Sequence, residues 1–137
     1  MTSLADEIAY NSHDVDDGLR SGLVSVDQLE DVALFARHAN EARREYPGLS
    51  GRRLIHETTR RMINAQVIDL IESSSARIAA AAPTSLADIH RATPLIAFSA
   101  SMAAENRALK GFLRDNLYRH YQVLRMTNKA NRIISDL

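Results

Sequence analysis

The sequence predicts an all-α domain, because apolar residues recur at helical spacing along nearly all of its 137 residues. It contains only five glycines and three prolines, and most of them fall between the periodic segments. Hydrophobic residues make up 45% of the chain, which suits a globular core and argues against disorder. Together these observations predict one domain of about five helices.

The first two predicted helices occupy residues 3–22 and 25–46. Gly22 is expected to end the first one, because glycine adopts the left-handed conformation that closes many helices. The second begins at Ser25, which stands at capping-box spacing from Gln28. The Pro-Gly pair that follows residue 46 is expected to end it.

The third predicted helix is the longest and runs over residues 50–82. Pro83 is expected to stop it, because proline lacks the N–H that a continuing helix needs. Its apolar residues at helical spacing are expected to form the stripe that faces the core. This stripe consists of Ile63, Val67, Leu70, Ile71 and Ile78.

The last third of the chain predicts a short helix over residues 85–91, an extended connector over 94–98 and two further helices. The first of these starts at Ser99 or Ser101 and runs to about residue 125, and Thr127 is expected to cap the other. One apolar face of the 99–125 helix is expected to carry Met102, Leu109, Leu113, Leu117 and Leu124.

Composition excludes several classes of function. Seventeen basic residues cancel seventeen acidic ones, so the charge gives no hint of nucleic-acid or membrane binding. The chain has no cysteine, which excludes disulfides and zinc sites with Cys ligands. No secretory signal is visible, and no apolar run approaches the roughly 20 residues that a membrane span needs. We therefore expect a cytoplasmic protein that does not bind a membrane.

The first helix carries a row of polar side chains. Asp6, Tyr10 and Asp14 are four residues apart, so each step turns only about 40° around the helix and all three share one face. Such a row could bind a divalent metal and a hydroxyl-bearing substrate. Any surface helix also shows a polar face opposite an apolar stripe, so a simply solvated face remains the alternative. The adjacent His13 and Asp14 are not interpreted as a metal-binding doublet, because no later histidine stands at metal-ligand spacing.

Three segments resemble one enzyme family. Residues 5–20, ADEIAYNSHDVDDGLR, resemble a segment of the bacterial dGTP triphosphohydrolase-like enzymes of the HD superfamily. Residues 52–64 and 118–132 resemble two further segments of these enzymes, in the same order. Within the third segment, Tyr118 and Tyr121 are interpreted as packing residues rather than ligands.

The resemblance implies roles for the first helix. In this family a His, a His-Asp doublet and a later, separate Asp hold a divalent metal, Mg²⁺ or Mn²⁺. Asp6 matches that later Asp, whereas Tyr10 and Asp14 match positions that contact the sugar of the nucleotide. The doublet lies upstream in the family and has no counterpart here, so we expect that this chain alone does not bind the metal stably.

The implied reaction hydrolyses dGTP or another dNTP to a deoxynucleoside and inorganic triphosphate. The metal lowers the pKa of bound water, and cationic side chains shield the polyphosphate. Arg53 and Arg60 are seven residues apart, hence on one helix face, and could bind phosphate oxygens. The alternative is an exposed basic face in which Glu57 pairs with Arg53 at i, i+4.

The resemblance predicts that residues 1–137 are the C-terminal part of a dGTPase-like HD domain. The first helix begins almost at Met1 and the last ends without a polar tail, which agrees with this prediction. Whether the chain is itself an enzyme stays open, and we expect weak or absent hydrolysis. The alternative is a non-catalytic helical remnant or an oligomerisation module. Full-length family members are expected to form homo-oligomers, and nucleic-acid binding is a poor independent hypothesis.

Overall fold

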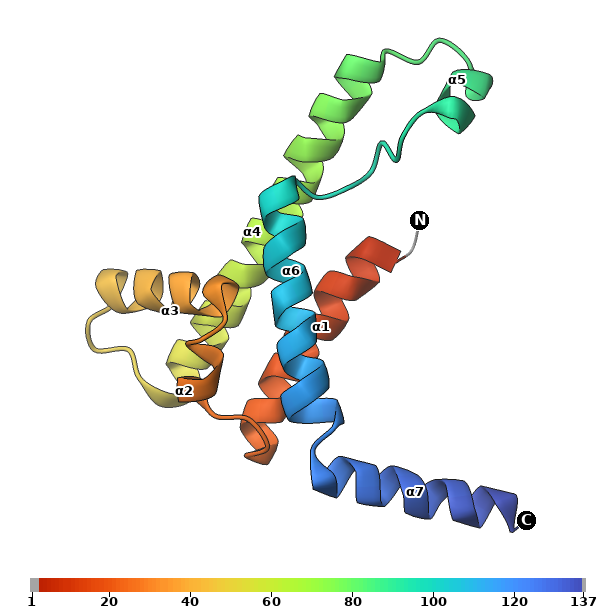
Figure 1. The fold of residues 1–137 in the computed structure, drawn as a ribbon. Helices are drawn as coiled ribbons and strands as arrows, with labels where there is room; N and C mark the ends of the chain where they lie inside the picture. Colours follow the sequence, from red (N-terminus) through yellow and green to blue (C-terminus); the bar gives the residue numbers. More distant parts are fainter. Residues whose placement is uncertain (1–2, 137) are drawn as a thin grey trace.

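The computed structural model describes residues 3–136, which form seven α-helices, one π-helical turn and no strand (Figure 1). The all-α prediction is confirmed. Five of these helices have at least 13 residues, in agreement with the expected five. No helix in the described range combines the length and hydrophobicity that crossing a bilayer requires.

The centre of the fold is formed by α1 (Ser3–Ser21), α4 (Gly51–Ala81) and α6 (Ala100–Leu113), with α1 packed against both of the others (Figure 1). The first helix ends where expected, with Gly22 at a φ of +71°. Its buried side is set by apolar residues seven positions apart, Ile8 and Val15. The core that they join also contains Leu34, Phe35, Met62, Leu109 and Leu113.

The expected single helix over residues 25–46 is wrong, because the chain turns within it. It forms α2 (Val26–Leu29) and α3 (Ala33–Glu45), with Val32 in an extended conformation between them. The capping box of Ser25 is confirmed. In one continuous helix Leu29 and Leu34 would point about 140° apart. The turn allows both side chains to be fully buried in the same core.

The limits of α4 are close to those expected, with Ser50 and Ala82 as its caps, but the expected core stripe is wrong. Ile63, Val67, Ile71 and Ile78 are exposed, and Leu70 is only half-buried. The buried face of α4 is instead formed by Leu54, Thr58, Met62, Gln66 and Ser74.

Two polar side chains can occupy this buried face because they bond to their own helix. The Thr58 hydroxyl donates to the Leu54 carbonyl oxygen at 2.7 Å, and the Gln66 amide donates to the Met62 carbonyl oxygen at 3.0 Å. Burial of a polar group is costly only when it is left without a hydrogen bond. These internal bonds reduce that penalty and leave the apolar stripe on the surface.

The segment between α4 and α6 behaves as expected. Ser85 caps the short α5 (Leu86–Arg91), which stands away from the other helices at the end of α4 (Figure 1). The chain then returns along α4, where the Asp69 carboxylate accepts hydrogen bonds from the Ser99 backbone N–H at 2.9 Å and hydroxyl at 2.6 Å. Ser99 in turn caps α6.

The expected continuous helix to residue 125 is wrong. After α6 the chain forms the π-helical turn η1 (Arg114–Tyr118), breaks at Arg119 and His120, and starts α7 (Tyr121–Ser135) well before the expected cap at Thr127. Leu113 and Leu117 are buried, but this break directs Leu124 outward. No described residue of α7 is buried, and the helix projects from the body (Figure 1).

Candidate functional site

The polar face of α1 is exposed. Because α1 is continuous, Asp6, Tyr10 and Asp14 lie along one side of it, away from the buried Ile8 and Val15. Asp6 and Tyr10 are exposed and Asp14 is half-buried. The helix therefore presents two carboxylates and a phenol to solvent in a row.

Tyr118 connects this polar face to the other end of the chain. Its phenol donates a hydrogen bond to the Asp14 carboxylate, across 104 residues of sequence. Partial burial, together with this bond, raises the pKa of the Tyr118 phenol to about 12. The packing interpretation missed this contact. The π-helical turn that positions Tyr118 could not be read from apolar periodicity, although such turns often occur at functional sites.

Tyr121, which was also interpreted as a packing residue, is 68% exposed. Its ring lies 4.8 Å from that of His120, measured between centroids. It is separated from Tyr118 by the break before α7, so it does not join the polar face through the same turn. The packing prediction for Tyr121 is therefore wrong.

Two further polar contacts fix α1 against α6. The Asn11 amide donates to the Asn106 side-chain oxygen at 3.4 Å, and both residues are buried. Glu7 forms an ion pair with Lys110, with 2.8 Å between carboxylate and ammonium. These contacts fix the orientation of α1 about its own axis relative to α6. They thereby fix the direction in which Asp6 and Tyr10 point.

The described residues do not make up a metal site by themselves. Nowhere among residues 3–136 do three histidine or carboxylate side chains come together as a set that could hold a metal ion. Asp6 is exposed and offers one carboxylate. A metal at Asp6 would need its other ligands from outside the described residues.

The predicted phosphate-binding arginines lie on α4. Arg60 is held by Glu57, with hydrogen bonds of 3.0 and 2.7 Å, and Arg61 donates to the same carboxylate at 2.7 Å. The guanidinium groups of Arg60 and Arg61 lower the pKa of Glu57 to about 2. The alternative pairing of Glu57 with Arg53 is therefore not the one that forms.

Arg53 and Arg60 come together at a surface cavity of about 400 Å³. Arg53 is exposed and makes no ion pair within the described part of the chain. The cavity is lined by Tyr46, Leu49, Arg53, His56, Glu57 and Arg60.

A larger groove of about 520 Å³ lies between α1 and α4, and His56 lines both cavities. From α1, the groove is lined by residues on the side next to the polar face, including His13 and Asp16. Asp6, Tyr10 and Asp14 line neither of these two cavities. The structure therefore groups the arginines at one cavity and leaves the α1 polar face outside both cavities.

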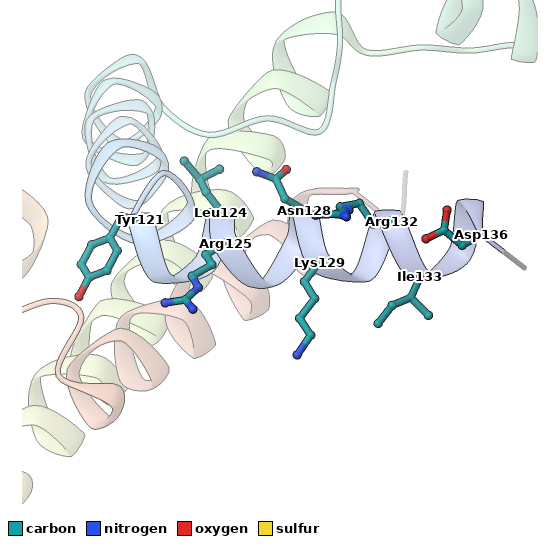
Figure 2. A pocket seen from close by; sticks show the side chains of 8 residues that line it. All are labelled: Tyr121, Leu124, Arg125, Asn128, Lys129, Arg132, Ile133 and Asp136. Carbon is teal, nitrogen blue, oxygen red and sulfur yellow. The ribbon is translucent and has the colours of Figure 1, made fainter.

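A third hollow, of about 840 Å³, lies along α7 and is lined by residues of that helix alone. It contains three cationic side chains, those of Arg125, Lys129 and Arg132, beside Tyr121 and Asn128 (Figure 2). Leu124 and Asn128 lie on a different side of the helix from Lys129 (Figure 2). Side chains spread around one exposed helix do not form a closed binding site.

The chain is similar in sequence to known proteins. A model of the phosphohydrolase-associated domain matches residues 96–137. Over all 137 residues, the chain is 58% identical to a deoxyguanosinetriphosphate triphosphohydrolase-like protein of Ralstonia nicotianae. Proteins of the same name from Bordetella pertussis and Thiobacillus denitrificans are 56% and 52% identical over the same length.

The chain spans only part of these relatives, 35% of the first and 36% of the other two. The match covers 100% of this chain in each case, so α1, α4, α6 and α7 all have counterparts in the relatives. Along its whole length, the chain is thus homologous to about a third of a deoxyguanosinetriphosphate triphosphohydrolase-like protein.

Proposed function

We propose that this chain supplies the nucleotide-facing helix of a dNTP triphosphohydrolase acting on dGTP, and that it corresponds to the C-terminal part of the catalytic HD domain. The observation that carries the proposal is the exposed row of Asp6, Tyr10 and Asp14 on α1, within the segment 5–20 that resembles the family. The names of the relatives support the same reaction class. The activity would be exercised in the cytoplasm and in a homo-oligomer of the full-length protein.

The residue types on α1 suit distinct roles. Asp6 would contribute one carboxylate to a divalent metal, Mg²⁺ or Mn²⁺, whose other ligands come from the rest of the protein. Tyr10 and Asp14 would face the deoxyribose, where a carboxylate accepts a hydrogen bond from a sugar hydroxyl. Tyr118 would act as a positioning residue, since its phenol holds the Asp14 carboxylate in one orientation.

The arginines on α4 suit the triphosphate. Arg53 is the stronger candidate, because its guanidinium is exposed and unpaired within the described residues. Arg60 would have to exchange its Glu57 contacts for phosphate oxygens, which makes its contribution smaller. In the proposed reaction, water adds to the α-phosphorus and the bond to the 5′ oxygen breaks, which yields a deoxynucleoside and triphosphate.

The isolated chain would hydrolyse dNTPs weakly or not at all, because its residues do not complete a metal site. The proposal is tested in a chimera in which these 137 residues replace the matched third of the Ralstonia nicotianae relative. We expect this chimera to release triphosphate from dGTP in the presence of Mg²⁺ or Mn²⁺.

Single substitutions in the chimera test the roles. Asp6→Asn and Asp14→Asn are expected to reduce kcat/KM for dGTP at least about tenfold, the size of effect that follows from losing one well-placed polar contact. Asp27→Asn, an exposed carboxylate on α2, serves as the matched control and should leave turnover unchanged. An unchanged kcat/KM in both the Asp6 and the Asp14 variant would remove the proposal.

A further inference from the structure

The groove between α1 and α4 lies on the surface, although its lining is mainly apolar. We call it the α1–α4 groove and define it by Ala5, Ile8, Ala9, Ile63, Val67 and Ile71. Its volume is about 520 Å³, and Ile63, Val67 and Ile71 are 37%, 39% and 60% exposed. An apolar strip of this kind, bordered by His13, Asp16 and His56, is typical of a surface that another polypeptide covers.

The orientation of α4 strengthens this interpretation. A surface helix normally turns its apolar stripe towards the core. Here Thr58 and Gln66 are fully buried on the inner face, while Ile63 and Val67 lie outside. Thr58 and Gln66 each donate a hydrogen bond to their own helix, which lowers the cost of burying them, although the side-chain oxygen of Gln66 has no partner among the described residues.

We propose that the occupant of the α1–α4 groove is the remaining two thirds of the triphosphohydrolase-like protein to which this chain is homologous. The relatives match all of this chain but extend well beyond it, since the chain spans only 35% of the length of the Ralstonia nicotianae protein. They therefore possess both helices of the groove together with a much larger stretch of polypeptide. None of the described helices of this chain covers the groove.

The position of the groove beside the polar face of α1 also suits this occupant. The groove and the polar face share α1, so a segment seated on Ile8 and Ile63 would reach the side of the helix that carries Asp6. Asp6 is the residue that lacks companion ligands among the described residues. This proposal concerns assembly, and it would stand even if the assembled protein hydrolysed no nucleotide.

The test uses the absence of cysteine from the chain, which makes single introduced thiols clean reporters. Val67→Cys and Ile71→Cys place a thiol in the groove, and Ile89→Cys places one on α5, where Ile89 is 48% exposed. Maleimide labelling rates at each site are measured by mass spectrometry in the isolated chain and in the chimera with the Ralstonia nicotianae relative. We expect the two groove sites to react at least tenfold more slowly in the chimera, and the Ile89 site to react equally in both.

Equal labelling of the groove sites in both proteins would overturn the proposal. Protection in the isolated chain that increases with its concentration would also overturn it, because a second copy would then be the occupant. If the chimera does not fold, the aligned positions of the full-length Ralstonia nicotianae protein carry the same thiols. Reactive groove positions in that folded protein would equally reject the proposal, whatever its activity towards dGTP.

Discussion

The phenol of Tyr118 donates a hydrogen bond to the carboxylate of Asp14 and so joins the π-helical turn after α6 to the polar face of α1. The two residues are 104 positions apart. The bond limits the orientations of a carboxylate that is otherwise half-exposed. We therefore expect Tyr118 to contribute to stability and, through the proposed role of Asp14, to substrate binding.

Replacement of Tyr118 by phenylalanine should lower the free energy of unfolding by about 0.5–1.5 kcal/mol, the usual net contribution of one hydrogen bond. Urea denaturation of the isolated chain measures this change. Tyr10→Phe is the matched control, because Tyr10 is 68% exposed, and its effect should stay within about 0.5 kcal/mol. Equal effects of the two substitutions would show that the Tyr118 contact contributes nothing in solution.

In the active chimera, Tyr118→Phe should raise the KM for dGTP and leave kcat within about twofold. A residue that only orients a carboxylate proposed to bind the sugar contributes to ground state and transition state alike. Steady-state release of triphosphate separates the two parameters. A fall in kcat with unchanged KM would contradict a positioning role.

Met62→Ala should destabilise the chain by about 2–5 kcal/mol, the range for truncating a buried methionine. Met62 is fully buried on the inner face of α4. Ile71→Ala, on the outward stripe of the same helix, should change stability by less than about 0.5 kcal/mol in the isolated chain. Thermal unfolding of both variants compares the two faces directly, and a larger loss at Ile71 would restore the orientation first expected for α4.

Acid should weaken the contact between Glu57 and its two arginines. The pKa of Glu57 is lowered from 4.5 to about 2, so its carboxylate stabilises the folded state above pH 4.5 and loses this contribution as the pH falls towards 2. The difference in unfolding free energy between the natural chain and Glu57→Gln should shrink over the same interval. A difference that stays constant from pH 4.5 to 2 would contradict this prediction.

Ala82→Gly should stabilise the end of α4 by roughly 0.5–1 kcal/mol, because a non-glycine residue in the left-handed region is strained and glycine is not. Ala82 has a φ of +39° and ψ of 51°. Amide hydrogen exchange in the last turn of α4 should slow accordingly. Ala79→Gly, within the helix, should have the opposite sign and cost about 1 kcal/mol.

Helix content and most caps follow from local signals, which is why the sequence predicts α1, α4 and α5 with nearly correct limits. The choice of which face of α4 is buried does not follow from local signals. The sequence predicts that the apolar residues face the core, but Thr58 and Gln66 each donate a hydrogen bond within the helix and are buried instead. Whether the polar or the apolar face of α4 is buried depends on which helices pack against it. The local periodicity of the sequence contains no information about those helices.

In the candidate site, too, some features follow from the sequence and others depend on the three-dimensional structure. The shared face of Asp6, Tyr10 and Asp14 follows from a spacing of four in one helix and is present in the structure. The contact of Tyr118 with Asp14 depends on the π-helical turn, and the pairing of Glu57 with Arg60 and Arg61 depends on side-chain geometry. Contacts of these kinds could not be read from spacing. The roles of Asp6, Tyr10, Asp14, Arg53 and Arg60 in binding stay predictions.

The long sequence separation of the contacts between α1 and the α6–η1 segment affects the order of events on the ribosome. Translation produces α1 before either Asn106 or Tyr118, its partners across 95 and 104 residues. Loops of this length close late, since contacts distant in sequence form after local ones. During synthesis the Asn11 and Asp14 side chains of α1 are therefore without these partners, and the contacts of α1 with the α6–η1 segment are complete only after Tyr118 has left the exit tunnel.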